Sequence, residues 1–412
     1  MIGGSTIGDL INTLIDYRGK TPSKTISGVP LITAKVIKGG IILDEPREYI
    51  AEDNYDAWMR RGLPASGDIL ITTEAPLGEV ARVGTESRIA LAQRVILLRP
   101  DPDKVDPSFM FHYLRSPQAQ AALKRRSSGT TVSGIRQPEL RALEVPLLTR
   151  PAQEEIGGVL DSIDDLIANN RRRVEVLEEM VRAVYCEWFV KYRYPGHGHV
   201  RMVDSALGPI PEGWAVGVID DLLSIVRATV APSTIDPDTP AVGLEHIPRQ
   251  RVTLDDWGSA SDQGSRKGVF ARGDILFGKI RPYFHKVSIA PIDGICSTDA
   301  IIIRPSEAYW GQVVAVVSSK EFVANATGTS NGTKMPRADW KVIGQWPVVV
   351  PPGSLAEAFT GMARDQLGMA ERLMLENRSL MTLRDVLLPK LVTGEIDVST
   401  LDLHALLAEQ AA

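Results

Sequence analysis

The residues of this chain best suited to chemistry are basic side chains next to hydroxyl and glycine residues. Residues 124–131 read Lys-Arg-Arg-Ser-Ser-Gly-Thr-Thr. A second such loop, 328–334, reads Gly-Thr-Ser-Asn-Gly-Thr-Lys, and a basic stretch at 279–286 precedes it. Phosphate contacts require cationic side chains, hydroxyls and backbone amides. These loops therefore predict binding to nucleic acid.

Further basic residues stand near the start of the chain, and Arg and Asn can also read base edges in the major groove. A single basic loop is usually only a solvated loop, but recurrence in two places favours binding. The candidate DNA-binding residues are Arg18, Lys20, Lys24, Lys35, Thr72, Thr73, Lys124, Arg125, Arg126, Thr130, Arg266, Lys267, Lys279, Arg281, Tyr283, His285, Thr329, Asn331 and Lys334.

Catalytic motifs are absent from the sequence. It has no P-loop, no His-Glu-x-x-His, no Cys-x-x-Cys, no Gly-x-Ser-x-Gly and no dinucleotide-binding glycine loop. Asp161, Asp164 and Asp165 are predicted to be exposed flanks of a helix and not acid–base residues. His197 and His199 stand in a Gly- and Pro-rich linker and are predicted to be solvent-exposed and not metal ligands.

The elements that hold these residues occur twice. Gly67-Asp68-Ile69-Leu70 returns 206 residues later as 273–276, and Arg-Pro at 99–100 returns at 304–305. Apolar runs at 30–34, 68–72 and 90–98 predict strands, and 107–123 predicts a helix. Pro30 and Pro240 occupy matching places, as do Ile37 and Ile247. The second half is therefore predicted to repeat the plan of the first.

A long heptad-patterned helix follows each half, and the two are predicted to bury each other. Pro151 is predicted to open the first helix, and Pro389 to stop the second. Asn170 stands in the predicted seam, where a polar residue sets the register, so leucine there is expected to stabilise the helices but loosen the register. The predicted seam residues are Ile163, Leu166, Asn170, Leu177, Val184, Met362, Leu373 and Leu380.

Length and charge complete this organisation. The 412 residues predict a domain at 1–150, a helix at 151–191, a second domain at 192–350 and a helix with a tail at 351–412. Residues 1–150, 151–190, 191–350 and 351–412 carry net charges of +3, −5, +1 and −4, so the predicted domains are mildly basic although the chain totals −5. Two cysteines, no apolar run that could span a membrane and no signal peptide predict a cytoplasmic protein.

Together these landmarks resemble the specificity subunit of type I restriction–modification systems. The resemblance runs over essentially the whole chain. The motifs that carry it lie at 16–23 (Asp-Tyr-Arg-Gly-Lys-Thr-Pro-Ser), 67–78 (Gly-Asp-Ile-Leu-Ile-Thr-Thr-Glu-Ala-Pro-Leu-Gly), 90–94 (Ala-Leu-Ala-Gln-Arg), 208–214 (Gly-Pro-Ile-Pro-Glu-Gly-Trp) and 387–396 (Leu-Leu-Pro-Lys-Leu-Val-Thr-Gly-Glu-Ile).

The resemblance implies an α+β fold with a pseudo-twofold internal repeat. Two similar mixed α/β target recognition domains would be separated by two long helices in an antiparallel coiled coil. Each domain would read half of a bipartite site in double-stranded DNA, and the helices would set the spacer and dock two methyltransferase subunits. S-adenosylmethionine, ATP and Mg would belong to partner subunits, including any restriction subunits, so the chain itself would be non-catalytic and hold no cofactor.

Two other functions stay open at this point. The acidic helices and negative total charge also fit a coiled-coil scaffold that binds only proteins. Salt-sensitive DNA binding that weakens when Lys124, Arg125 and Lys279 are changed to Glu would exclude the scaffold. The second alternative is an enzyme with an unrecognised site, which methyl transfer by the isolated chain would support.

Overall fold

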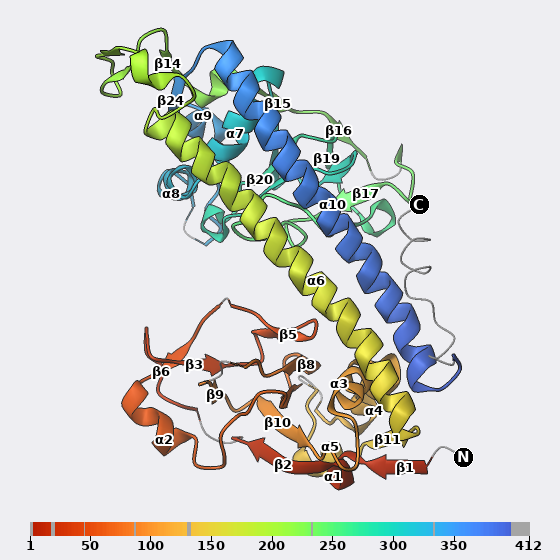
Figure 1. Ribbon diagram of the computed structural model, residues 1–412. Coiled ribbons are helices and arrows are strands. Elements are labelled where there is room, and N and C mark those ends of the chain that lie inside the picture. Colours follow the sequence, from red (N-terminus) through yellow and green to blue (C-terminus); the bar gives the residue numbers. More distant parts are fainter. Residues whose placement is uncertain are drawn as a thin grey trace. The chain divides into compact units, whose positions relative to one another are not determined.

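The structure is a computed structural model, and it describes residues 3–17, 21–44, 46–85, 88–129, 133–231, 234–332 and 334–396. The chain divides into two compact units (Figure 1). Unit 1 comprises residues 1–165 and 380–412, and unit 2 comprises residues 166–379. The long helices α6 (Arg150–Tyr185) and α10 (Gly353–Val392) both run through the two units.

Besides its parts of the long helices, unit 1 contains short helices and strands. Its helices are α1 (Ile7–Leu10), α2 (Tyr55–Trp58), α3 (Pro107–Arg115), α4 (Pro117–Arg126) and α5 (Gln137–Arg141). Its strands are β1 (Gly3–Thr6), β2 (Ile11–Asp16), β3 (Val29–Ile32), β4 (Ile37–Lys38), β5 (Ile41–Ile42), β6 (Tyr49–Ile50), β7 (Ile69–Thr73), β8 (Leu77–Arg82), β9 (Ala90–Leu91), β10 (Val95–Pro100) and β11 (Glu144–Leu147).

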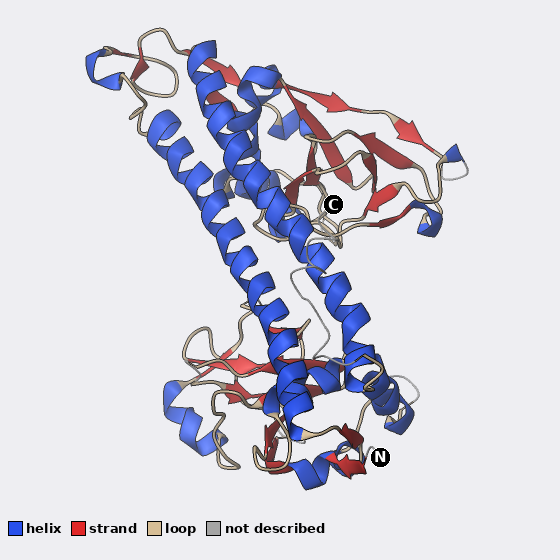
Figure 2. Ribbon diagram, turned by 45° about the vertical axis from the view of Figure 1, so that its right-hand side comes forward, coloured by secondary structure: helices blue, strands red, loops and turns tan. Residues whose placement is uncertain are grey.

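Unit 2 has a similar set of elements, and most of its strands lie to one side of the two long helices (Figure 2). Its helices are α7 (Trp310–Val317), α8 (Lys320–Gly328) and α9 (Trp340–Ile343). Its strands are β12 (Met202–Val203), β13 (Ile210–Pro211), β14 (Ala215–Val218), β15 (Leu223–Val226), β16 (Thr229–Val230), β17 (Pro240–Val242), β18 (Gly258–Ser259), β19 (Lys267–Phe270), β20 (Ile275–Gly278), β21 (Val287–Ile289), β22 (Gly294–Cys296), β23 (Ala300–Pro305) and β24 (Pro347–Val350).

The predicted repeat is present in the sheet topology. Unit 1 has an antiparallel sheet of order β2-β10-β7-β8, and unit 2 has one of order β15-β23-β20-β21. In each unit two short strands also pair in parallel, β3 with β9 and β17 with β22. Pro30 and Pro240 occupy the same place, each one residue before the first parallel pairing. The fold class predicted from the sequence is therefore confirmed.

A buried aspartate fixes the same turn in both units. Asp68 and Asp274 each accept two hydrogen bonds from an arginine across the sheet, at 2.7–2.8 Å for Arg99 and 2.7 Å for Arg304. The preceding glycine, Gly67 or Gly273, has φ +86°, which side chains rarely adopt. The repeated Gly-Asp-Ile-Leu motif is thus a turn that starts the central strand.

Apolar burial explains where the strands form. All five residues of β7 are buried, and all the residues of β20 are buried as well. Strands that are covered on both faces read as continuous apolar runs. The predicted strand at 90–98 is wrong at its centre: it is two strands, β9 and β10, because Ala92–Arg94 turn between them.

Two helix predictions also need correction. The helix expected at 107–123 is broken at Ser116, whose hydroxyl caps the new helix α4 by accepting the Ala119 N–H at 3.2 Å; Pro117 opens that helix. The second long helix does not stop at Pro389 but continues to Val392. Burial of Leu391 and Val392 holds this last turn, which precedes Gly394 at φ +71°.

Within each unit, α6 and α10 run antiparallel and share a seam. In unit 2, Asn170 Nδ2 donates to Asn377 Oδ1 at 3.1 Å, and Val174 packs with Leu373 and Met374. In unit 1, Arg384 of α10 donates to Asp164 of α6 at 2.8 Å. The two residue numbers of each contact add up to 547 or 548. This constant total means that the two helices run antiparallel in one register.

The predicted seam residues lie at two depths. The buried ones are Ile163, Asn170, Leu373 and Leu380, and the half-buried ones are Leu166, Leu177, Val184 and Met362. Prediction missed the buried Ile167, Val174, Ala370 and Met374. No helix in the described part of the chain is both long enough and apolar enough to cross a membrane.

Candidate nucleic-acid interface

The basic loop of unit 1 lies against the end of its central strand. Ser128 and Gly134 pair through two backbone hydrogen bonds at 2.9 and 3.0 Å, so these two residues lie side by side. Gly134 also pairs with Glu74, the first residue after β7. The last turn of α4 leads into this loop and carries Lys124, Arg125 and Arg126, all three exposed. Arg126 lies 3.5 Å from the Glu139 carboxylate.

The basic loop of unit 2 is built in the same way. Asn331 and Arg337 pair through backbone hydrogen bonds at 3.0 and 2.9 Å, and Arg337 also pairs with Ile280 at the end of β20. The next residue, Arg281, donates its backbone N–H to Pro336 at 2.7 Å. The structure therefore brings the predicted stretches 279–286 and 328–334 together.

A strongly cationic cavity of about 510 Å³ opens beside this loop in unit 2. Four basic side chains line it: Arg227, Lys279, Arg337 and Lys341. Asp299 partly compensates them, because Arg337 donates to its carboxylate at 3.2 Å. The other polar lining residues are Thr229, Thr298, Asn331 and Asp339. Two further candidates lie near this cavity: Arg266 donates to Thr229 at 3.2 Å, and Lys267 is the next residue.

A smaller cavity of about 190 Å³ lies beside the equivalent strand end of unit 1. Lys24 and Lys35 line it, and both face the Glu48 carboxylate, at 2.6 and 3.8 Å. Gln93 and Arg94 line the same cavity just after β9. Both units thus combine basic groups with hydrogen-bonding side chains at one end of the parallel strand pair, as recognition of a polar anionic ligand requires.

Not every predicted residue reaches this surface. Thr72 and Thr73 are buried in β7, and the Thr72 hydroxyl accepts the Glu79 N–H at 2.9 Å. His285 turns inward and shares a hydrogen bond of 2.8 Å with the Ser318 carbonyl; burial lowers the pKa of His285, although this hydrogen bond opposes the shift.

The remaining candidates are exposed or lie outside the described residues. Tyr283, Thr329 and Lys334 are exposed, and the half-buried Arg281 donates to the Lys334 carbonyl at 3.5 Å. Arg18, Lys20 and Thr130 lie outside the described residues.

Sequence reasoning did not select several residues of these cavities, namely Gln93, Arg94, Arg227, Thr298, Arg337 and Lys341. Arg227, Arg337 and Lys341 each stand alone between apolar residues and form no basic run. Alignment of the two copies position by position could have found Gln93 and Thr298, because both follow a short apolar strand by two residues.

The acidic residues of α6 differ from the prediction. Asp161 and Asp164 are not exposed flanks but are partly buried ion-pair partners in unit 1, because α3 packs against this turn of α6. Asp161 accepts hydrogen bonds from Ser108 at 2.6 Å and Arg82 at 3.0 Å, and it lies 2.8 Å from His112 Nε2.

Burial alone would raise the pKa of Asp161, but the hydrogen bonds to His112, Arg82 and Ser108 outweigh it, so that the pKa lies well below the ordinary value. Burial likewise raises the pKa of Asp164, and the charges and hydrogen bonds of Arg115 and Arg384 more than reverse the effect. These carboxylates are therefore held ionised as structural groups.

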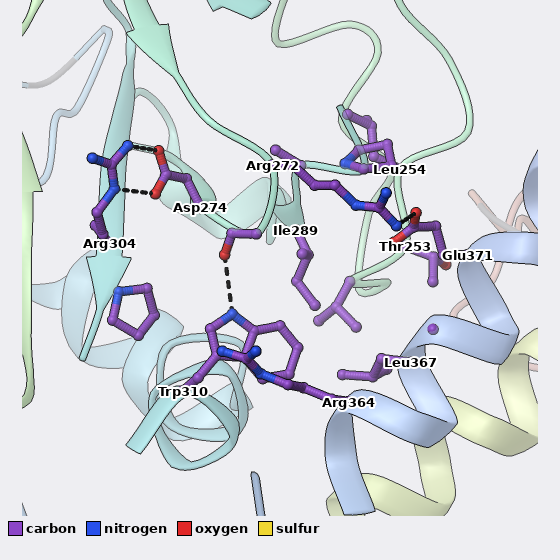
Figure 3. A pocket seen from close by; sticks show the side chains of 16 residues that line it. Thr253, Leu254, Arg272, Asp274, Ile289, Arg304, Trp310, Arg364, Leu367 and Glu371 are labelled. Carbon is purple, nitrogen blue, oxygen red and sulfur yellow. Dashed lines mark hydrogen bonds and ion pairs between the residues drawn. The ribbon is translucent and has the colours of Figure 1, made fainter. Parts of the chain in front are cut away.

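A further cavity of about 470 Å³ in unit 2 is lined by charged side chains that pair with one another (Figure 3). Arg304 binds Asp274, Arg272 lies 2.6 Å from Glu371 of α10, and Trp310 donates to the Gly273 carbonyl at 3.0 Å. These contacts tie the Gly-Asp turn to α7 and α10. Among the described residues, no group of three or more His, Cys, Asp or Glu side chains is placed to hold a metal ion.

This chain is similar to known proteins in both sequence and fold. Residues 5–179 match the family described as "Type I restriction modification DNA specificity domain". The type I restriction enzyme MjaIX specificity subunit of Methanocaldococcus jannaschii is 24% identical over 405 residues, which cover 93% of this chain and 91% of that protein. The EcoDI specificity subunit of Escherichia coli is 23% identical over 273 residues, 61% of each chain.

A solved structure has the same fold over nearly the whole chain. It is the S subunit of a type I restriction–modification system from M. genitalium, with a TM-score of 0.53 and 16% sequence identity, and the match covers 95% of this chain and 96% of that one. The chain is therefore similar to specificity subunits of type I restriction–modification systems, in its sequence over residues 5–179 and, at lower identity, over most of its length. It shares the fold of one solved S subunit.

Proposed function

We propose that this chain is the DNA-reading, non-catalytic subunit of a type I restriction–modification complex, and that each unit reads one half of a bipartite site in double-stranded DNA. One observation carries the proposal: the same strand end is joined to a basic, polar loop in both units. A fold that is repeated with different side chains suits two ligands of the same chemical class that differ in sequence. Duplex DNA with two half-sites is such a ligand.

The charge distribution supports DNA as the ligand of this surface. Four cations and several hydrogen-bonding groups line the unit 2 cavity, with Asp299 and Asp339 as the nearby carboxylates. In unit 1, α4 ends in three consecutive exposed cations, whose charge outweighs the partial negative charge at the C-terminal end of the helix. Contacts of this kind position a duplex through its phosphates, and neighbouring polar side chains can then reach base edges.

The long helices are proposed to set the spacer and to dock two methyltransferase subunits. In unit 2, the outer face of α6 and the turn after it expose Val176, Met180 and Val190, which are 54%, 47% and 58% accessible. Glu179 and Glu187 flank these apolar side chains on the same stretch. An acidic, partly apolar face repels DNA phosphates and fits a protein partner.

In this proposal the chemistry belongs to the partners. The methyltransferase subunits would bind S-adenosylmethionine and methylate adenine, and restriction subunits would bind ATP and Mg and cleave DNA. This chain would hold no cofactor and would supply only the position of the complex on its target.

The test is footprinting and methylation mapping of the reconstituted complex with methyltransferase subunits. We expect two short protected blocks separated by an unread gap, and methylated adenines within those blocks. Changing Lys124, Arg125 and Lys279 together to Glu should weaken binding by at least tenfold and reduce its salt dependence. A single unsplit site, or DNA binding insensitive to these changes and to salt, would contradict the proposal. A complex that does not bind DNA would favour the protein-binding scaffold.

A further inference from the structure

The two units can be aligned residue by residue at the strand end that carries the basic loop. Thr73 donates its N–H to the Arg94 carbonyl at 2.9 Å, and Lys279 donates to the Asp299 carbonyl at 2.9 Å. The Thr73 carbonyl accepts from Ile135 at 3.0 Å, and the Lys279 carbonyl accepts from Ala338 at 2.9 Å. These hydrogen bonds make Thr73 equivalent to Lys279 and Arg94 equivalent to Asp299.

The neighbouring residues follow from the same framework. Ala92 and Ser297 each donate a backbone hydrogen bond of 3.0 Å to the last residue of the parallel strand beside them, so the next residues, Gln93 and Thr298, are equivalent. The loop bridges align the rest. We name this set of positions the variable corner: it comprises Thr73, Glu74, Gln93, Arg94, Ser128 and Gly134 in unit 1, and Lys279, Ile280, Thr298, Asp299, Asn331 and Arg337 in unit 2.

The two units agree in the residues of the Gly-Asp turn but differ in the residues of the variable corner. The aspartate–arginine pair of the Gly-Asp turn has the same residues and bonded atoms in both units, at 2.7–2.8 Å in unit 1 and 2.7 Å in unit 2. All six positions of the variable corner, a short distance along the same strands, hold different residues. Folding requirements shared by the two units therefore preserve the frame and leave the corner unconstrained.

Each corner holds an arginine–carboxylate ion pair, but the positions of the two charges differ between the units. In unit 1, Arg94 Nε lies 2.7 Å from Glu74 Oε1. In unit 2, Arg337 Nη2 lies 3.2 Å from Asp299 Oδ1, so a carboxylate occupies the position of Arg94. The four side chains are 33–55% accessible. Half-exposed pairs of this kind contribute only about 0–1 kcal/mol to stability, so stability does not account for keeping one pair in each corner.

An arginine oriented by a carboxylate keeps other N–H groups free to donate. Such groups bind guanine O6 and N7, glutamine and asparagine bind adenine N6 and N7, and threonine can contact any base edge. Unit 1 presents Gln93 with Arg94, and unit 2 presents Thr298 and Asn331 with Arg337. The two corners thus offer different hydrogen-bond patterns from the same backbone position.

From this we infer that the variable corner reads base-pair edges in the major groove, and that Gln93 and Arg94 determine the half-site of unit 1 while Asn331 and Arg337 determine that of unit 2. The inference rests on the proposed function and deepens it, because it separates residues that read bases from those that bind phosphates. Lys124 and Arg125 lie outside the corner and contribute to DNA affinity by binding phosphates.

The experiment measures the sequences methylated by the reconstituted complex in a plasmid library with randomised half-sites. The variants are Gln93→Ala and Arg337→Ala. The matched controls are Arg88→Ala and Arg201→Ala, exposed arginines that pair with Glu52 at 2.5 Å and Glu212 at 3.5 Å away from the corner. Where methylation is weak, competition binding with singly substituted duplexes gives the same discrimination.

We expect Gln93→Ala to relax discrimination about 5- to 100-fold at one or more positions of one half-site, and Arg337→Ala to do so only in the other half-site. The controls should leave both half-sites unchanged. The inference is overturned if both variants still select the original two half-sites, or if either variant changes both half-sites equally. A wild-type complex that shows no bipartite site would instead refute the proposed function.

Discussion

At the scale of single residues, the chain separates groups that hold the fold from groups that face a ligand. Asp68, Asp161 and Asp274 are carboxylates whose partners are all supplied by the protein. Arg227 and Lys341 are exposed side chains that line an open cavity. Residue type alone does not distinguish the two classes, because a lone aspartate in the sequence shows neither its burial nor its partner.

His112 is a buried structural residue that makes the stability of unit 1 depend on pH. It is fully buried in unit 1, and burial lowers its pKa below the ordinary value, with the hydrogen bond to Asp161 opposing the shift. The unfolded chain therefore binds a proton more readily than the folded chain below about pH 6.5. We predict that the free energy of unfolding falls as the pH falls from 7 to 5, by at most about 1.4 kcal/mol per pH unit from this group.

The measurement is urea unfolding of the wild type and of His112→Gln between pH 5 and pH 7.5. Glutamine keeps a hydrogen-bond donor near Asp161 but does not titrate. The wild type should lose stability more steeply than the variant as the pH falls. His285 also has a lowered pKa, but it is present in both proteins, so the difference in slope isolates His112. Equal slopes would contradict the prediction.

At the scale of elements, the seam between α6 and α10 contains a fully buried polar pair. Asn170 and Asn377 are both 1% accessible in unit 2, and they share one side-chain hydrogen bond. Asn377 Nδ2 also lies 3.3 Å from the Ile167 carbonyl. This geometry changes the expectation for Asn170→Leu, since leucine there would leave the Asn377 side-chain oxygen without its donor.

We now predict that Asn170→Leu lowers the free energy of unfolding by about 0.5–1.5 kcal/mol, the net value of the hydrogen bond that it removes. The unpaired Asn377 Oδ1 of the variant takes the place of Asn170 Oδ1, which has no partner among the described residues of the wild type. The double variant Asn170→Leu/Asn377→Leu should recover most of that loss, because it removes both partners. Thermal or urea unfolding of the three proteins checks this. A single variant more stable than the wild type would contradict the argument and restore the expectation from sequence alone.

Sequence patterns predicted elements well where a period or a repeat was strong, and failed where local chemistry interrupted it. The heptads of α6 and α10 and the two Gly-Asp-Ile-Leu turns were read correctly. The break at Ser116 was missed because the apolar face of 107–123 continues across it. Thr72 and Thr73 were selected for their hydroxyls, yet they stand in a strand covered on both sides.

The candidate interface was only partly predictable for a related reason. Runs of basic residues are visible in a sequence, and the structure does place 279–286 beside 328–334. The variable corner is assembled from three separate segments in each unit, and its equivalences depend on backbone hydrogen bonds. No linear motif marks such a set, so Ser128 and Asn331, on the loops, can be matched only in three dimensions.

At the scale of the whole molecule, the continuity of α6 and α10 through both units is the feature that makes a spacer proposal testable. The register pairs Asp164 with Arg384 and Asn170 with Asn377. Any change of length must therefore be made in both helices at once. Residues 166–172 of α6 and 375–381 of α10 are one heptad each and face one another in this register.

Deleting both heptads should shorten the unread gap between the half-sites and leave the half-sites themselves unchanged. Seven residues correspond to about 10 Å of helix, or about three base pairs of DNA at most. Methylation mapping of the reconstituted complex measures the gap. Deleting 166–172 alone serves as the control, because it moves one seam past the other by a heptad and should reduce stability. If the matched deletion folds and methylates with an unchanged gap, the helices do not set the spacer.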